Sequence, residues 1–242
     1  MSSEEVKETY DRIAETYSKK RKDPASSAWN DLMEVPAMES LLRPLAKGTH
    51  ALDLGCGTGL LTKGLMALGA GCVIGIDQSE EMIKIARQDF PENEFFVGTI
   101  EKLPFKERTF DLVASSLVLH YLKDLAPTIR EVSRVLKPGG SFVFSLHHPF
   151  EECIRREKNS VVALPYFHNN GYYWRMCGTE FLSFHHTLEN IINSLYAAGF
   201  TTQKILETRP NSANRAAFND YEVISQYPTF LIVWAMGTGS GT

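Results

Sequence analysis

Short β-rich runs alternate with helical runs over the middle of the chain, and this alternation constrains the fold more than any other feature. The β-rich runs are HALDL (50–54), GCVIGID (71–77), EFFVG (94–98), FDLVASS (110–116) and GSFVFSL (140–146). The helical runs between them are LLTKGLMALG (60–69), SEEMIKIARQ (79–88), LVLHYLKD (117–124) and LAPTIREVSRVL (125–136). Strands that alternate with helices of this length predict a doubly wound α/β fold around a parallel sheet.

The remaining segments extend this core on both sides. A helix is predicted over 187–199, followed by two closing strands at 201–208 and 228–236. Before the core, residues 4–18 form an amphipathic pattern that predicts a helical lid, with apolar side chains at Val6, Tyr10, Ile13, Ala14 and Tyr17. With 242 residues, 43% of them hydrophobic, one large domain accounts for the chain.

We expect a single domain over residues 1–236, followed by a flexible tail at 237–242. Within it, residues 1–48 form the helical lid, 49–146 the ligand-binding core, 147–186 an inserted cap and 187–236 the closing helix and strands. The cap contains an aromatic stretch from Tyr166 to Phe184 without clear periodicity. Aromatic side chains at that place predict a closed, apolar pocket.

A glycine-rich turn follows the first β-rich run and carries the strongest local signal of function. Asp53 precedes a G-x-G-x-G sequence at Gly55, Gly57 and Gly59, and glycines allow a ligand to approach the backbone closely. A carboxylate at this position fits a cationic amine better than a pyrophosphate. Leu60 also stands where a dinucleotide-binding fingerprint would place its third glycine.

A second carboxylate ends the next β-rich run. Asp77 lies 22 residues after Gly55, where an acidic side chain can accept hydrogen bonds from both ribose hydroxyls. Two acids therefore face an adenosine-like ligand with a cationic end.

Four motifs in order resemble those of the class I S-adenosylmethionine-dependent methyltransferases. They are DLGCGTG, GIDQSEEMI, VGTIEKLPFKERTFDLV and LKPGG. These motifs are most similar to those of the small-molecule and ubiquinone-type branch. The resemblance implies a Rossmann-like seven-stranded sheet of order 3-2-1-4-5-7-6 with strand 7 antiparallel, and S-adenosylmethionine as cofactor, with S-adenosylhomocysteine as product.

The same resemblance implies roles for individual residues. Around the methionine moiety it places Gly55, Cys56 and Gly57, with Ser115 or Ser116 at the amine and Arg21 at the carboxylate; the charge and position of Asp53 suit the same amine. Around the nucleoside it places Asp77 and Gln78 at the ribose and adenine edge, and Thr99 and Ile100 beside the adenine. Met82 is interpreted either as a core-facing helix residue or as a side chain packed on the base. Thr99 stands where many relatives carry Asp, and Cys56 can equally be a small residue that the turn requires.

A base is needed only if the acceptor is a hydroxyl or a protonated amine, and histidine is the side chain best suited to that work. His147 and His148 follow the last strand of the core, where ligands of open α/β sheets bind. We predict His148 as the first candidate catalytic residue, His185 as the second, and Tyr17, one helical turn before Arg21, as the third. His120 is interpreted as structural.

Composition limits the chemical classes of methyl acceptor that we expect. The net charge of −4 and pI near 6.0 provide no positive field for nucleic acid, so a small-molecule acceptor is predicted and a tRNA base is the alternative. A non-catalytic S-adenosylmethionine-binding protein and a nicotinamide oxidoreductase are further alternatives. The four cysteines lack metal-site spacing, so no metal is expected. No window is long and apolar enough for a signal peptide or membrane span, which predicts a cytoplasmic protein of open oligomeric state.

Overall fold

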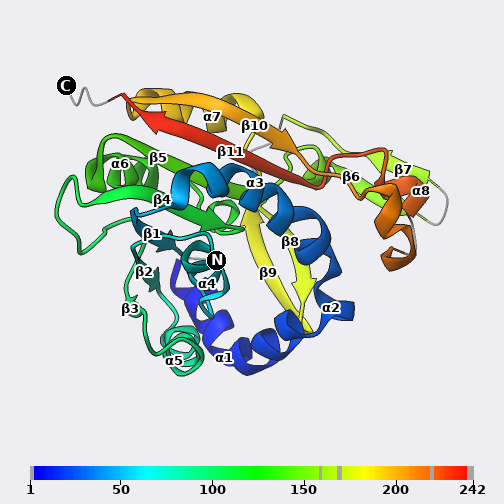
Figure 1. Cartoon of the computed structure of the whole chain (residues 1–242). Helices are drawn as coiled ribbons and strands as arrows, with labels where there is room; N and C mark the ends of the chain where they lie inside the picture. Colours follow the sequence, from blue (N-terminus) through cyan, green and yellow to red (C-terminus); the bar gives the residue numbers. More distant parts are fainter. Residues whose placement is uncertain (1–2, 158–159, 168–170, 219–220, 239–242) are drawn as a thin grey trace.

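The computed structural model describes residues 3–157, 160–167, 171–218 and 221–238. Its centre is a seven-stranded sheet in the order β3-β2-β1-β4-β5-β11-β10 (Figure 1). The strands are β1 (His50–Leu54), β2 (Cys72–Asp77), β3 (Glu94–Val97), β4 (Phe110–Ser116), β5 (Leu136–His147), β10 (Phe200–Glu207) and β11 (Phe230–Gly237). β11 runs antiparallel to both of its neighbours, β5 and β10, whereas the other strand pairs of this sheet are parallel. The predicted order, with the last strand of the chain inserted antiparallel, is confirmed.

Helices cover both faces of this sheet, and the side chains of β5 show why. Phe142 and Phe144 pack in the core cluster under α6 (Ala126–Val135) and α7 (Leu188–Ala197). Val143, between them, packs in the opposite cluster under α3 (Val35–Ala46) and α4 (Leu60–Ala67). Successive side chains of a strand point to opposite faces, so a strand covered on both sides reads as an unbroken apolar run.

Most predicted helices are confirmed, but the one over 117–124 is wrong. Only a 3₁₀ turn, η2 (Leu119–Tyr121), forms there. Leu117 takes a left-handed backbone with φ of 56°, and its N–H donates to the Ser145 side chain at 3.0 Å. Leu119 and Leu122 still face the core, which gives the segment its apolar pattern without a helix.

The N-terminal helix α1 (Ser3–Lys22) lies across the carboxyl ends of the strands, fastened to α5 (Glu80–Asp89). Asp11 of α1 accepts from the Ser79 hydroxyl at 2.6 Å and from the Glu81 N–H at 3.2 Å, at the amino end of α5. Lys22 forms an ion pair with Asp89 at 2.7 Å. After α1 come α2 (Pro24–Trp29) and a π-helical turn, η1 (Asn30–Glu34), that leads into α3.

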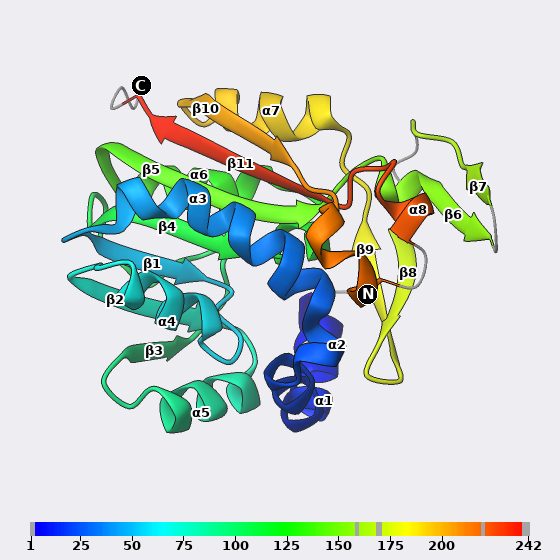
Figure 2. The same ribbon diagram turned by 45° about the vertical axis from the view of Figure 1, so that its right-hand side comes forward.

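The segment after β5 forms two β-hairpins, β6 (Ile154–Glu157) with β7 (Ser160–Ala163), and β8 (Gly171–Met176) with β9 (Thr179–Phe184). Sequence reasoning found no periodicity in the aromatic stretch. Trp174 and Phe181 nevertheless pair across β8 and β9 with stacked rings 5.2 Å apart. The β8–β9 hairpin reaches down to α1 (Figure 2), where Phe181 contacts Tyr10 at a ring distance of 5.1 Å.

The last elements are a 3₁₀ segment, η4 (Ser212–Ala217), and α8 (Tyr221–Ile224), between β10 and β11, while η3 (Glu151–Cys153) precedes β6. None of the helices in the described parts of the chain combines the length and apolar character needed to cross a bilayer.

Candidate active site

A cavity of about 1030 Å³ lies at the carboxyl ends of β1, β2, β4 and β5. Its walls come from the glycine-rich turn, the inner face of α1, the segment 116–123 and the inserted β8 strand. Ligands of open α/β sheets bind at this edge, where the strand order reverses. The cavity therefore occupies the place that the fold provides for a ligand.

The glycine-rich turn shapes the cavity floor through two glycines with left-handed backbone. Gly55 has φ of 75°, and a Cβ there would lie 2.5 Å from a methyl of Val118. Gly57 has φ of 50°, and a Cβ there would meet nothing within 4 Å. The first glycine thus permits close packing of the turn against segment 116–123. The second leaves open space in front of the backbone, and this opening fits a bound cofactor.

Asp77, at the end of β2, lines the cavity beside this turn. Its carboxylate accepts the N–H of Gly57 and the N–H of Ser79, each at 2.9 Å. Burial raises the pKa of Asp77, while these backbone hydrogen bonds act to lower it. A carboxylate oxygen can accept more than one hydrogen bond, so Asp77 is held in place with acceptor capacity remaining for a ligand.

Asp53, at the end of β1, is almost fully buried at 1% exposure. One oxygen accepts from the Thr62 hydroxyl at 2.7 Å, whereas Oδ1 has no hydrogen-bond partner among the described residues. Burial raises the pKa of Asp53 to about 7. A buried carboxylate with an unsatisfied oxygen is costly unless a ligand pairs with it, and an ammonium group would do so.

The structure brings most of the predicted cofactor residues into this one cavity. Besides the two aspartates and the turn, the lining includes Arg21, Cys56, Gln78, Met82, Thr99, Ile100 and Ser116. Arg21 is paired with Asp31 at 3.1 Å. Ser115 is the exception, because it is fully buried and its hydroxyl donates to the Leu54 carbonyl at 2.8 Å.

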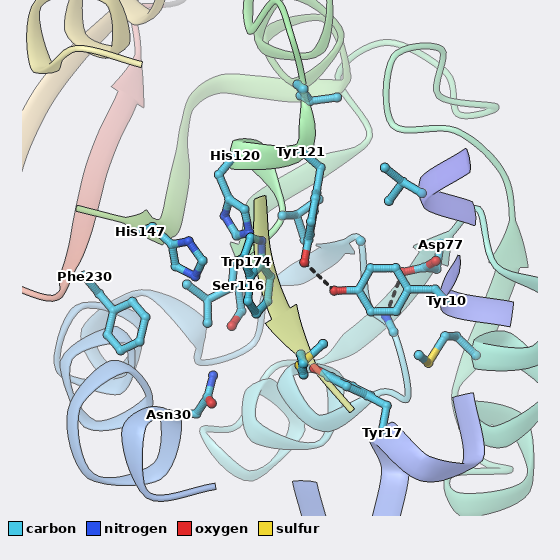
Figure 3. A pocket seen from close by; sticks show the side chains of 18 of the residues that line it. Tyr10, Tyr17, Asn30, Asp77, Ser116, His120, Tyr121, His147, Trp174 and Phe230 are labelled. Atoms are coloured by element: carbon cyan, nitrogen blue, oxygen red, sulfur yellow. Dashed lines mark hydrogen bonds between the residues drawn. The ribbon is translucent and has the colours of Figure 1, made fainter. Parts of the chain in front are cut away.

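The other half of the cavity has aromatic and histidine walls. Figure 3 shows Asp77 and Tyr10 on one side and His147 and Phe230 on the other, with Trp174 between them. Tyr10 and Tyr121 share a hydrogen bond of 2.7 Å between their hydroxyl oxygens. Tyr17, the third candidate catalytic residue, lines the cavity and packs edge-on against Tyr10. Trp29 and Asn30 complete this half.

The two histidines predicted as catalytic lie outside the cavity lining, and each has a packing role. His148 accepts the Phe150 N–H on Nδ1 at 3.0 Å and lies 2.8 Å from Glu207 through Nε2, so both ring nitrogens are engaged. The side chain of His185 is fully buried, with Nδ1 2.7 Å from Glu152. Their placement gives no support to the prediction that they contact the acceptor.

His147 and His120 line the cavity instead, with their rings stacked 4.2 Å apart. His147 is the last residue of β5 and shares the strand face of Val143, opposite that of His148. The strand period of two separates these neighbours, and the exact strand end decides which one faces the ligand. His120 was interpreted as structural because it was expected in a helix over 117–124. In the structure it lies in a 3₁₀ turn that lines the cavity.

Comparisons with known proteins agree with this geometry. A family model described as a methyltransferase domain matches residues 52–144. An S-adenosylmethionine-dependent methyltransferase from Mesorhizobium loti superposes with a TM-score of 0.73 at 30% identity, over 83% of this chain and 96% of that one. An uncharacterized protein of Haemophilus influenzae is 32% identical over 93% of this chain and 94% of its own. A demethylmenaquinone methyltransferase of Symbiobacterium thermophilum is 32% identical over 62% of each chain.

Fold, cavity and similarity together define a Rossmann-like transferase built around a nucleoside site. The chain belongs to the class I S-adenosylmethionine-dependent methyltransferases. Its cofactor is S-adenosylmethionine, and the orphaned Asp53 oxygen and the open space at Gly57 fit that ligand. This family membership rules out the alternative of a nicotinamide oxidoreductase.

Proposed function

We propose that this enzyme methylates a small molecule enclosed in the aromatic half of the cavity. The observation that carries the proposal is a single cavity whose lining joins the glycine-rich turn and Asp77 to the aromatic walls around Trp174. The similarity to a demethylmenaquinone methyltransferase supports a small acceptor. The net charge of −4 gives no support to the alternative of a tRNA base.

The chain's own residues have separate tasks in this proposal. Asp77 accepts hydrogen bonds from the ribose hydroxyls, Asp53 pairs with the methionine ammonium, and Arg21 faces the methionine carboxylate. Gln78, Thr99, Ile100 and Met82 surround the adenine, while Cys56 and Ser116 border the methionine chain. When bound, S-adenosylmethionine supplies a methyl group already activated by a positively charged sulfur.

The protein's contribution to rate is alignment and exclusion of water. Helix α1 and the β8–β9 hairpin close over the strand ends, where Tyr10 meets Phe181 and Tyr121. Holding two reactants in line in a closed site removes much of the entropic barrier of a bimolecular displacement. The acceptor's reacting atom would then lie where the cofactor half meets the aromatic half of the cavity.

Labelled methyl transfer tests this proposal. Cell extract stripped of small molecules and extract left complete are incubated with the enzyme and radiolabelled S-adenosylmethionine. After chromatographic removal of the unreacted S-adenosylmethionine, we expect a labelled low-molecular-mass product in the complete extract only. Label in RNase-sensitive material would contradict a small-molecule acceptor. The Asp77→Ala variant, which lacks the ribose contact, is the matched control.

A further inference from the structure

A chain of hydrogen bonds leads from the aromatic half of the cavity into the inserted segment. His147 Nδ1 lies 3.1 Å from the Tyr172 hydroxyl oxygen, and that hydroxyl donates to Glu152 Oε1 at 2.8 Å. We infer that His147 is the general base of the reaction, that Tyr172 and Glu152 position it, and that the acceptor is a planar ring carrying a neutral hydroxyl. This inference rests on the small-molecule methyl transfer proposed above.

The hydrogen-bond directions fix the tautomer of His147. A tyrosine hydroxyl has one proton, and a carboxylate is a stronger acceptor than a neutral imidazole nitrogen. Tyr172 therefore donates to Glu152 and accepts from His147, which requires the proton of His147 to lie on Nδ1. Nε2 then carries the lone pair that a general base needs.

That lone pair is available to an acceptor. His147 lines the cavity, and no hydrogen bond to its Nε2 is made by any residue that the structure describes. Figure 3 shows the His147 ring directed into the space between His120, Trp174 and Phe230. A hydroxyl bound in this space can donate to Nε2 without displacing a protein partner.

Glu152 is itself rigidly held. Its side chain is 3% exposed, and its second oxygen lies 2.7 Å from His185 Nδ1. Burial raises the pKa of Glu152, while the hydrogen bonds with His185 and Tyr172 lower it. His185, predicted from the sequence as a base, is thus separated by three hydrogen bonds, through Glu152 and Tyr172, from the residue that contacts the acceptor.

The surroundings of His147 keep it uncharged. His120 stacks on it, Trp174 meets it edge-on with ring centroids 5.2 Å apart, and Phe230 lies 6.1 Å away. Burial lowers the pKa of His147 to about 4. A neutral ring is suited to a site beside a cationic sulfur, which would repel an imidazolium.

A weak base is sufficient for this chemistry. The hydroxyl oxygen of the acceptor uses a lone pair to form the C–O bond, and the C–S bond breaks with its electron pair left on sulfur. The hydroxyl proton becomes strongly acidic as the oxygen gains carbon, and it passes to His147 Nε2. The resulting imidazolium keeps its Nδ1–H bond to Tyr172, whose hydroxyl is oriented by the Glu152 carboxylate. A carboxylate acceptor would need no such base.

The walls around His147 favour a planar acceptor. Trp174 and Tyr121 lie with their ring planes 26° apart, and His120 and His147 lie 14° apart, so flat faces border the space. Aromatic faces pack well on other rings. Neither ring nitrogen of His120 has a hydrogen-bond partner among the described residues, which leaves a place for a second polar group of the acceptor.

Nitrogen NMR of the histidine rings tests the tautomer directly. The probe is full-length, ¹⁵N-histidine-labelled enzyme saturated with S-adenosylhomocysteine, and His147→Gln assigns the signals. We expect His147 to carry its proton on Nδ1 in the wild type. Tyr172→Phe should move it toward the Nε2–H tautomer, because a buried Nδ1–H without an acceptor is unfavourable. Glu152→Gln should move it in the same direction by less.

Tyr196→Phe is the matched control, since Tyr196 is 81% exposed on α7 and should leave the His147 signals unchanged. A wild-type spectrum in which the His147 proton lies on Nε2 would overturn the inference. His147 signals that stay at wild-type positions in folded Tyr172→Phe would overturn the positioning role.

Kinetics test the base itself. With a panel of phenols, aliphatic alcohols, amines and carboxylates, we expect phenols to give methyl ethers. His147→Gln should then lower kcat about 100-fold or more, with KM within about threefold. Turnover of other classes only, or an unchanged kcat, would refute the base or the acceptor class. Label found in RNA in the extract experiment would instead refute the proposed function, so the two failures are distinguishable.

Discussion

The two halves of the cavity are built in opposite ways. The half that we propose for the cofactor is centred on two short segments at the ends of β1 and β2, which contribute the glycine-rich turn and two carboxylates to the lining. The acceptor half is assembled from α1, the 3₁₀ turn after β4, the end of β5 and the β8–β9 hairpin. In this proposal, short local motifs bind the cofactor that the family shares, whereas the acceptor is surrounded by side chains that only the tertiary fold brings together.

The largest expected effect tests whether the turn depends on tight packing as well as on backbone freedom. Gly55→Ala should lower the free energy of unfolding by about 2 to 4 kcal/mol, through left-handed strain and a clash with Val118. Gly178→Ala is the matched control, because it shares a left-handed φ of 74° but has nothing within 4 Å of a Cβ. It should lose only about 1 kcal/mol. Equal losses in urea denaturation would contradict the packing argument.

The separation of the two halves is tested by comparing one residue from each. Asp77→Ala should weaken S-adenosylhomocysteine binding by about 1.5 to 3 kcal/mol, because hydrogen bonds to a charged acceptor are lost. Trp174→Leu should leave that affinity within about twofold while reducing turnover. Isothermal titration calorimetry measures both. A large loss of cofactor affinity in Trp174→Leu would show that the halves are not independent.

The pH dependence of cofactor binding sharpens the role of Asp53. With a pKa of about 7, this carboxyl is mostly protonated below pH 7 and charged above it. Binding of an ammonium group should therefore strengthen about tenfold between pH 6 and pH 8. The free energy of unfolding of the ligand-free protein changes in the opposite direction. The stability that the protonated Asp53 carboxyl contributes is lost as pH rises through 7.

Asp53→Asn provides the control for this titration. It should bind S-adenosylhomocysteine more weakly at pH 8, with an affinity that changes little between pH 6 and pH 8. A wild-type affinity that is flat over this range would show that Asp53 does not pair with the ligand amine.

The smallest effect on catalysis is expected at the histidine that sequence reasoning favoured. His148→Ala should change kcat less than about twofold, since His148 does not line the cavity. It should lower the free energy of unfolding by about 1 kcal/mol, because the Phe150 N–H and Glu207 lose their partner. Thermal denaturation and steady-state kinetics measure the two. A 100-fold fall in kcat would reverse our assignment of roles to His147 and His148.

Sequence reasoning succeeded where chemistry and chain order coincide. The strand alternation predicted the sheet correctly, and the turn with Asp53 and Asp77 lies in the cavity where we propose that the cofactor binds. The choice between His147 and His148 depends on a single residue of register at the end of β5, which the sequence alone does not determine; only His147 lines the cavity. The prediction of a helix over 117–124 was wrong. Leu119 and Leu122 are buried in the core and give the segment a helix-like apolar pattern, although it forms only a 3₁₀ turn.

Other parts of the site had no local signal at all. Glu152 is one of many acidic residues in the sequence, and its link to His147 exists only because the β8 strand brings Tyr172 between them. The aromatic stretch predicted a closed pocket but not a hairpin. The pairing of β8 with β9, in which Trp174 lies opposite Phe181, is known only from the structure.

A crystal structure with S-adenosylhomocysteine bound tests the division of the cavity most directly. We predict the ribose hydroxyls on the Asp77 carboxylate, the amine at Asp53, and the sulfur turned toward the chamber that His147, Trp174 and Phe230 enclose. A ligand whose sulfur points away from His147, or whose ribose makes no contact with Asp77, would contradict the account.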